Sequence, residues 1–249
     1  MLTKARIKLI RSLRLKKYRQ QNNLFVAEGT KIVTEIVQSD WSVVQVLATA
    51  AWVQQHEALL TGQEVLTVSD KQMQQLTLLS SPSPALALVE MPDPAPLPDL
   101  TRQWTLYLDD IRDPGNLGTI IRLADWFGWP TICLTPETVD PFNPKVIQAS
   151  MGSLTRVELP TIDPDTFWDH AKDIPIWGAH MEGTSIYEAT LPQAGILCIG
   201  SESHGLSPLV EAHCTDHITI PRQGHAESLN AAMATGILLS HMTMKKQNQ

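Results

Sequence analysis

Four prolines fall within ten residues at 91–100, MPDPAPLPDL, and they limit most strongly how this chain can fold. Proline opposes both helix interiors and central strands, so a semi-extended linker is expected there. The 249 residues then divide into two modest domains, which are large enough to bury a core. We take residues 1–91 as the first domain, 92–103 as the linker and 104–249 as the second domain.

The hydrophobic pattern predicts an α/β fold on both sides of this linker. The first half alternates short helices and strands, beginning with a basic amphipathic helix from Lys4 to about Lys17. The second half has short apolar strands without alternation, separated by helices, which indicates a parallel sheet covered on both faces. Ligands of such sheets bind beyond the carboxyl ends of the strands. The loops after 105–110, 195–200 and 217–221 are therefore the ones to examine.

Charge is distributed unevenly along the chain. The net charge is −7, but residues 1–91 carry ten Lys or Arg against seven Asp or Glu, while residues 92–249 carry nine against nineteen. A local cluster of basic residues in the first half can neutralise phosphates although the remainder of the chain is acidic. A solvated helix face explains the cluster equally well on composition alone. The candidate RNA-binding residues are Lys4, Arg6, Lys8, Arg11, Arg14, Lys16, Lys17 and Arg19.

Several classes of protein are disfavoured by the composition. No apolar run approaches the roughly 18 residues of a membrane span, and the basic amphipathic start does not read as a secretory signal. The three cysteines, Cys133, Cys198 and Cys214, form no CxxC pair, so a disulfide framework is not expected and a reducing cytoplasm is the default location. His204, His213 and His217 lie close in sequence without a metal-binding motif, and no metal site is expected.

The three loops carry the most unusual sequence in the chain. The first is DPGNLGTIIR at 113–122, where Asn116 is placed to cap a helix that carries Arg122. The second is GSESHGLS at 200–207, with glycines that allow close approach of a ligand. The third is IPRQGHAESLN at 220–230, where a helix is expected to begin near Ser228 and to present Asn230 in its first turn. No GxGxxG or GxxxxGK[ST] motif is present, so dinucleotide and triphosphate cradles are unsupported.

Together these segments resemble, in order, the motifs of the SpoU/TrmH family of RNA 2′-O-ribose methyltransferases, part of the SPOUT superfamily. NPKVIQASMGSL at 143–154 resembles the segment between the first two motifs. RxxxxxFxxEG at 19–29 resembles the family's ribosomal-protein-like substrate-binding domain. The resemblance covers essentially the whole chain.

The resemblance implies a parallel-sheet α/β catalytic domain with a trefoil knot, preceded by a small ribosomal-protein-like α/β RNA-binding domain. It implies S-adenosylmethionine as cofactor, a ribose 2′-hydroxyl as methyl acceptor, and a homodimer through the knotted domains with the helix at 228–242 as the natural contact. Ribosomal RNA is preferred over tRNA as the substrate, and a catalytically inactive RNA-binding relative is the other alternative. The implied cofactor-binding residues are Gly200, Gly205, Ile220, Pro221 and Leu229.

The implied catalytic residues are Asn116, Arg122, Glu202, Ser228 and Asn230. The activating role falls to Arg122, but a guanidinium is always protonated, so stabilising an oxyanion or holding a phosphate is physically easier than acting as a base. Asn116 and Ser228 can also serve as local helix caps. One departure is Gln148, which stands where many relatives carry arginine.

Overall fold

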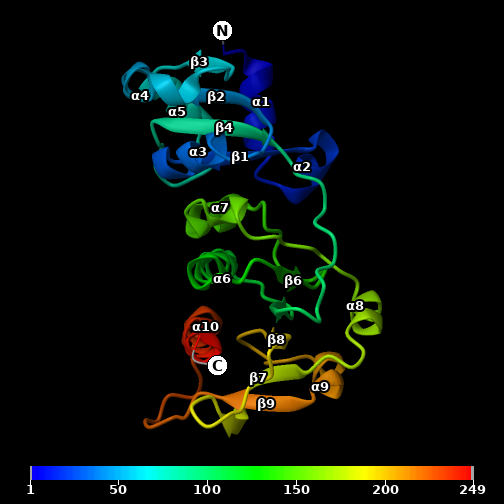
Figure 1. The fold of residues 1–249 in the computed structure, drawn as a ribbon. Coiled ribbons are helices and arrows are strands. Elements are labelled where there is room, and N and C mark those ends of the chain that lie inside the picture. The colour runs from blue at the N-terminus through cyan, green and yellow to red at the C-terminus, as the bar shows by residue number, and fades with distance from the viewer. Residues whose placement is uncertain (1, 248–249) are drawn as a thin grey trace. The chain divides into compact units, whose positions relative to one another are not determined.

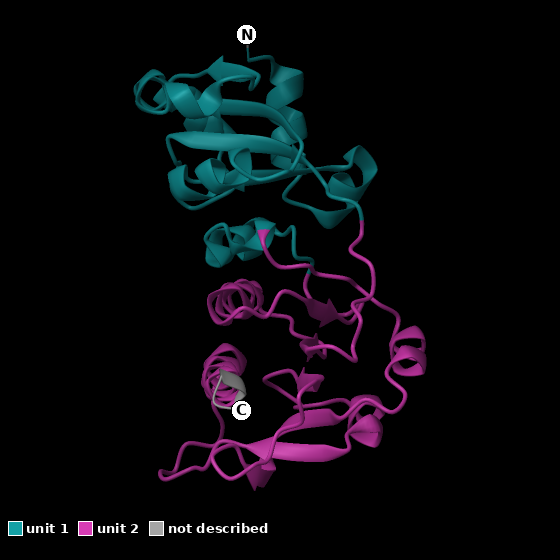
Figure 2. Cartoon of the chain, in the orientation of Figure 1, with its two compact units in different colours: residues 1–93, 140–155 teal, residues 94–139, 156–249 magenta. Residues whose placement is uncertain are grey.

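A computed structural model describes residues 2–247, and it divides into two compact units (Figure 2). Unit 1 comprises residues 1–93 and 140–155, and unit 2 comprises residues 94–139 and 156–249. The break near residue 93 falls in the proline-rich segment. The segment 140–155, which the sequence assigned to the second domain, belongs to unit 1, because its helix packs against the first strand of that unit. No helix within residues 2–247 is long and apolar enough to cross a membrane.

Unit 1 is built on a four-stranded mixed sheet with the order β1-β4-β2-β3. β4 pairs antiparallel with both β1 and β2, and β3 pairs parallel with β2. The strands are β1 (Leu24–Glu28), β2 (Val43–Ala48), β3 (Val65–Thr67) and β4 (Ala85–Glu90). The α-helices are α1 (Lys4–Ser12), α2 (Lys16–Asn22), α3 (Thr30–Val37), α4 (Ala50–Gln55), α5 (Asp70–Leu76) and α7 (Pro144–Ser150). The unit also has two short 3₁₀ helices, η1 (Glu57–Leu60) and η2 (Ser153–Thr155).

The expected helix from Lys4 to Lys17 is two helices, because the chain turns at a buried leucine. α1 ends at Ser12, Leu13 is fully buried, and Leu15 is extended before α2 begins. Arg19 donates Nη1 to the carbonyl oxygens of Leu13 at 2.8 Å and Arg14 at 2.9 Å, which satisfies the acceptors that this break leaves free. Its other guanidinium nitrogens bind Asp140.

The motif RxxxxxFxxEG is therefore a structural element of unit 1. Glu28, 4% exposed, accepts hydrogen bonds from Thr77 Oγ1 at 2.6 Å, from Leu78 N at 3.0 Å and from Ser83 N at 3.2 Å, so it fixes the loop before β4. The Phe25 ring packs against Phe142 at a centroid distance of 5.0 Å, which anchors the 140–155 segment. A buried carboxylate with three donors is costly to remove, because the donors lose their partner.

Unit 2 has a five-stranded parallel sheet with the order β6-β5-β8-β7-β9. This is the parallel sheet that the apolar, non-alternating strands predicted. The strands are β5 (Trp104–Leu108), β6 (Ile132–Leu134), β7 (Ile176–Ser185), β8 (Gly195–Ile199) and β9 (Asp216–Thr219). The helices are α6 (Pro114–Phe127), α8 (Pro164–His170), α9 (Pro208–His213) and α10 (Ala231–Gln247).

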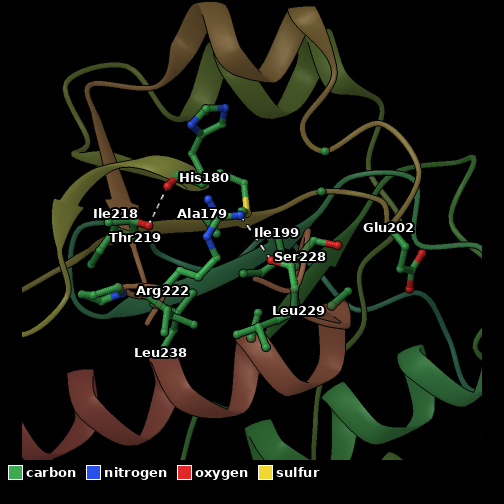
Figure 3. A pocket seen from close by; sticks show the side chains of 18 of the residues that line it. Ala179, His180, Ile199, Glu202, Ile218, Thr219, Arg222, Ser228, Leu229 and Leu238 are labelled. Carbon is green, nitrogen blue, oxygen red and sulfur yellow. Dashed lines mark hydrogen bonds between the residues drawn. The ribbon is translucent and has the colours of Figure 1, made fainter. Parts of the chain in front are cut away.

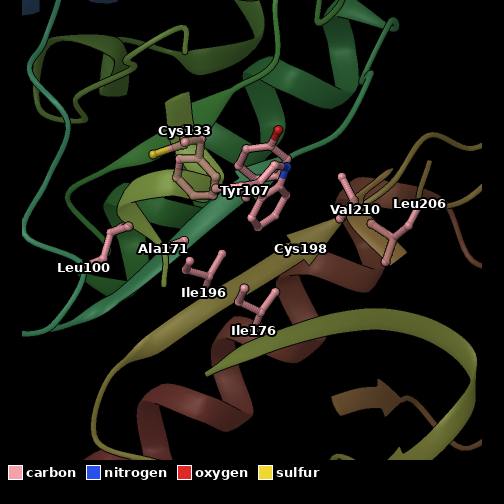
Figure 4. Close-up of a cluster of buried hydrophobic side chains, with 11 residues drawn as sticks. Leu100, Tyr107, Cys133, Ala171, Ile176, Ile196, Cys198, Leu206 and Val210 are labelled. Carbon is pink, nitrogen blue, oxygen red and sulfur yellow. The ribbon is translucent and has the colours of Figure 1, made fainter. Parts of the chain in front are cut away.

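Helices cover both faces of this sheet (Figure 1). α8 and α9 enclose one buried cluster, in which Tyr107, Phe167 and Trp168 pack ring against ring beside Cys198 and Val210 (Figure 4). On the other side, α6 and α10 pack against each other. A Cβ added at Gly236 would lie 3.3 Å from the Leu123 side chain, so the small residue lets the two helices approach closely.

Candidate active site

A pocket of about 570 Å³ opens at the carboxyl ends of β8 and β9. Its apolar wall includes Ile199, Ile218 and Leu238, and its rim is formed by the loops after the two strands. This is the position where parallel α/β sheets bind ligands, and the volume lies within the roughly 300–1,000 Å³ of small-molecule sites. Figure 3 shows these side chains around the pocket, with Glu202 standing apart from the other labelled residues.

The first rim is a tight glycine loop after β8. Ser201 and Gly205 exchange two backbone hydrogen bonds of 2.9 Å, and Gly205 has φ +70°. A Cβ at Gly200 would lie 2.1 Å from the Gly205 carbonyl carbon, so only glycine permits this closure. Both glycines line the pocket, together with Ser201, Glu202 and His204 of the same loop.

Three polar side chains from the three motif loops form one hydrogen-bonded chain. The backbone N–H groups of Ala232 and Met233 donate to Asn230 Oδ1 at 3.0 and 3.2 Å. Asn230 Nδ2 donates to Asn116 Oδ1 at 2.9 Å, and Asn116 Nδ2 donates to Glu202 Oε1. Because the backbone N–H groups at one end can only donate and the carboxylate at the other end accepts, the chain fixes the orientation of both amide groups.

Two helix caps differ from the sequence analysis. Asp113, and not Asn116, is the N-cap of α6, and it accepts from the Asn116 backbone N–H at 2.8 Å. Asn116 lies in the first turn, which leaves its side chain free for Glu202 and Asn230. α10 begins at Ala231 rather than near Ser228, because the Asn230 side chain accepts from the first-turn N–H groups. Ser228 therefore lies in the loop, where it lines the pocket.

The structure places the remaining predicted site residues in and beside the pocket. Gly200, Gly205, Ile220, Pro221 and Leu229 all line the pocket. Arg122 lies on α6, six positions after Asn116, and its side chain is exposed and outside the lining. Leu229 is 49% exposed although it is apolar. The structure thus brings together every implied cofactor residue, Ser228 and the Asn116–Glu202–Asn230 chain, and it leaves Arg122 on the neighbouring helix surface.

Asp109 is a positioning residue that the sequence analysis did not single out. It follows β5 and is 6% exposed, and its Oδ2 accepts from the Ser207 backbone N–H at 2.6 Å. Its own N–H donates to the Ile199 carbonyl at 2.9 Å. The residue ties the end of β5 to both ends of the glycine loop. The signal in the sequence was an acidic pair directly after a buried strand.

Two of the cysteines have no nucleophilic character. Burial raises the pKa of the Cys133 thiol to about 12, and burial, the largest cause, also raises the pKa of Cys198 well above its ordinary value. Both side chains are fully buried in unit 2. Thiol catalysis by these residues is therefore disfavoured.

The basic cluster lies in unit 1. Lys4, Lys8, Arg11, Arg14, Lys16 and Lys17 are exposed, and they remain available for an anionic partner. The prediction that Arg19 binds RNA is wrong, because its side chain is 2% exposed and paired with Asp140. Arg6 is half-buried and donates to Gln45 Oε1 at 3.0 Å. Gln148 is exposed on α7 in the same unit.

Comparison with known proteins identifies the family of this chain. Residues 103–240 match the model of the SpoU rRNA Methylase family, and residues 4–87 match that of the MRM3-like substrate binding domain. The chain belongs to the SpoU rRNA methylase family. It is 28% identical, over 95% of both chains, to the Bacillus subtilis 23S rRNA (guanosine(2553)-2′-O)-methyltransferase RlmP.

Two solved structures share both units. A TrmH-family protein from Porphyromonas gingivalis superposes with a TM-score of 0.87 at 38% identity, covering 98% of this chain and 99% of the other. An AdoMet-bound rRNA methyltransferase from Sinorhizobium meliloti gives a TM-score of 0.87 at 30% identity, covering 98% and 96%. The family and the α/β architecture expected from the motifs are thereby confirmed.

Proposed function

We propose that this chain transfers the methyl group of S-adenosylmethionine to a ribose 2′-hydroxyl of ribosomal RNA. The observation that carries the proposal is the Glu202–Asn116–Asn230 chain, which joins three motif loops beside a pocket at the carboxyl ends of β8 and β9. A pocket for a small molecule and a polar cluster beside it are the two parts that a group-transfer site needs.

The pocket residues fit the proposed cofactor. Ile199, Ile218 and Leu238 offer an apolar wall for an adenine ring, and Gly200 and Gly205 line the pocket after β8. Backbone groups at strand ends can hydrogen-bond to the edge of a base. When bound, the cofactor supplies a methyl group on a sulfonium, which is open to displacement by an oxygen nucleophile.

The residues of the chain then have to place and activate the ribose. As the 2′-hydroxyl attacks, negative charge develops on its oxygen, and a fixed cation lowers the energy of that charge. Arg122 is the candidate cation, since it is exposed on α6, the helix that carries Asn116. Asn116 and Asn230 hold Glu202 in one orientation, which gives Arg122 or the ribose a fixed acceptor.

The N-terminal unit is proposed to bind the RNA. Its exposed cations, Lys8 and Arg11 among them, suit contacts to phosphates that do not depend on base sequence. A ribosomal substrate is favoured over tRNA because RlmP, named for 23S rRNA, matches over 95% of both chains and thus shares this unit. In sequence, we propose that the RNA-binding domain spans residues 1–91 and the catalytic domain residues 104–249, although residues 140–155 of the latter pack in unit 1.

Three further features are part of the proposal. The family resemblance supports a trefoil knot in unit 2. A homodimer through unit 2 is supported by large apolar side chains left exposed there, among them Trp126 at 81% and Met233 at 62%. Three free cysteines support action in the reducing cytoplasm.

The test measures cofactor binding and methyl transfer separately. Calorimetry with S-adenosylmethionine is expected to show saturable binding by the full chain, and radiolabelled methyl is expected to enter ribosomal RNA as a ribose modification. Cofactor binding without transfer to any ribosomal RNA or tRNA would favour the inactive RNA-binding relative. Ribose methylation of tRNA alone would exclude the ribosomal substrate.

A further inference from the structure

A Glu-x-x-Cys-x-x-His segment gathers three donor atoms behind the pocket. Glu211 lies on α9, Cys214 is the C-cap residue directly after this helix, and His217 lies on β9. Oxygen, sulfur and nitrogen atoms of the three side chains all lie within 4.8 Å of one another, and each residue is partly buried. The spacing of three residues across the helix end and the following strand produces this convergence.

The donor set has the chemistry of a zinc site. Thiolate, imidazole and carboxylate are the groups that bind zinc in proteins, whereas magnesium and calcium prefer oxygen donors alone. Zinc bond lengths of about 2.0–2.3 Å in a tetrahedron require donor separations of about 3.3–3.6 Å. His217 Nε2 and Glu211 Oε2 are 2.6 Å apart, so these two atoms have to move apart to admit the ion, and three protein donors leave a fourth position for another ligand.

The neighbouring strand leaves room for these side chains. A Cβ at Gly178 on β7 would lie 2.9 Å from Cys214 Sγ and 3.2 Å from His217 Cδ2. Any larger residue at 178 would crowd the Cys214 sulfur and the edge of the His217 ring. His213, the other histidine of this segment, is engaged elsewhere: its ring stacks on Trp168 with centroids 4.5 Å apart, and its Nδ1 is 2.8 Å from the Leu209 carbonyl oxygen.

We propose that Glu211, Cys214 and His217 form a zinc site that braces the wall of the pocket. The His217 ring packs at 67° against His180 with centroids 5.4 Å apart, and His180 lines the pocket. β7 and β9 pair with a register shift between Ala179 and Thr184, so their ladder is interrupted beside His180. A cation on His217 restrains β9 at this interruption.

Cobalt substitution tests the proposal directly. Untagged full-length protein, stripped with a chelator, is titrated with Co²⁺ and then with Zn²⁺. We expect the protein to bind one equivalent of Co²⁺ with a thiolate-to-cobalt absorption band, and we expect Zn²⁺ to displace the bound Co²⁺.

Cys214→Ser and His217→Gln are expected to weaken Zn²⁺ binding at least about 100-fold, because each removes a bond to the metal. His213→Gln, a histidine of the same segment outside the cluster, is the matched control and is expected to bind as the parent does.

The parent protein alone can overturn the proposal. Bound Co²⁺ without a thiolate band would exclude Cys214 as a ligand, and an absence of stoichiometric binding would leave Glu211 and His217 as an ordinary hydrogen-bonded pair. Equal affinity in His213→Gln, Cys214→Ser and His217→Gln would place any bound metal elsewhere. Circular dichroism of each variant separates lost binding from lost folding, and the cobalt spectrum of the parent does not depend on any variant.

Discussion

Asn230 Nδ2 donates a hydrogen bond of 2.9 Å to Asn116 Oδ1, joining residues 114 positions apart in the sequence. The contact connects the first turn of α6 to the loop before α10. The Asn116 amide in turn donates to Glu202, so one asparagine links all three motif loops. We therefore expect this chain of hydrogen bonds to determine how precisely the acceptor ribose is placed.

Replacing Asn116 by alanine removes both links while leaving the α6 cap at Asp113 intact. We expect methyl transfer to fall by about 10- to 100-fold, because misplaced reacting groups lose rate without losing the fold. Cofactor affinity should change less than about 3-fold, since Asn116 does not line the pocket. Thr119→Ala, an exposed change on the same helix, is the control. Full activity in the Asn116 variant would remove the chain from the mechanism.

Gly200→Ala tests the glycine loop. The new Cβ would lie 2.1 Å from the Gly205 carbonyl carbon, so the loop has to open and its backbone leaves the pocket rim. We expect cofactor affinity, measured by calorimetry, to fall at least about 10-fold, or about 1.4 kcal/mol. Gly224→Ala is the matched control, because Gly224 also lines the pocket and a Cβ there meets nothing within 4 Å. Similar losses in both variants would contradict this role for the loop.

Arg122→Ala is expected to lower methyl transfer by at least about 1,000-fold while cofactor affinity stays nearly intact, since a charge-stabilising group acts on the transition state. Arg122→Lys should restore part of the rate, because it returns the charge without the planar fork of donors. Single-turnover transfer and calorimetry measure the two effects. Unchanged turnover in Arg122→Ala would exclude the residue from the chemistry.

Lys8→Gln combined with Arg11→Gln tests RNA binding by unit 1. Both side chains are exposed on α1, and deleting the helix is unsuitable because Ile10 and Leu13 are fully buried. We expect weaker RNA affinity and a salt slope reduced by about 1 for each lost phosphate contact. Lys172→Gln, an exposed change in unit 2, should leave the slope unaltered. An unaltered slope in the double variant would show that α1 does not contact RNA through these side chains.

We expect the folding stability of the chain to depend on pH through His241. Burial, and then the charge of Lys245, lower the pKa of its imidazole below the ordinary value of 6.5. The folded state therefore favours neutral His241, and stability is expected to decrease as the pH falls below about 6.5 towards the lower folded pKa. His241→Gln should reduce the difference in melting temperature between about pH 7.5 and pH 5.5. An equal or larger difference in the variant would show that other groups cause the dependence.

The sequence predicted the elements that carry the site because their signals are local. Apolar strands without alternation predicted the parallel sheet of unit 2. The glycines at 200 and 205 were expected to allow close approach of a ligand, and both line the pocket. All five implied cofactor residues line one pocket.

Other features depended on contacts between distant residues. Arg19 was assigned to RNA because of its charge, but its partner Asp140 lies 121 positions away and could not be identified from local pattern. The Asn116 and Ser228 side chains each had a local capping interpretation beside the functional one. Only the fold shows that Asp113 caps α6 and that the Asn116 amide is free to reach Glu202.

Mapping of ribose methylation in cellular ribosomal RNA tests the central proposal most directly. RNA from cells with this protein, without it, and with its Arg122→Ala variant is compared by resistance to alkaline cleavage, which a 2′-O-methyl group confers. We predict a ribose position that is methylated in the first sample and unmethylated in the other two. Identical ribose methylation in all three samples, or loss of a base methyl group instead, would contradict the account.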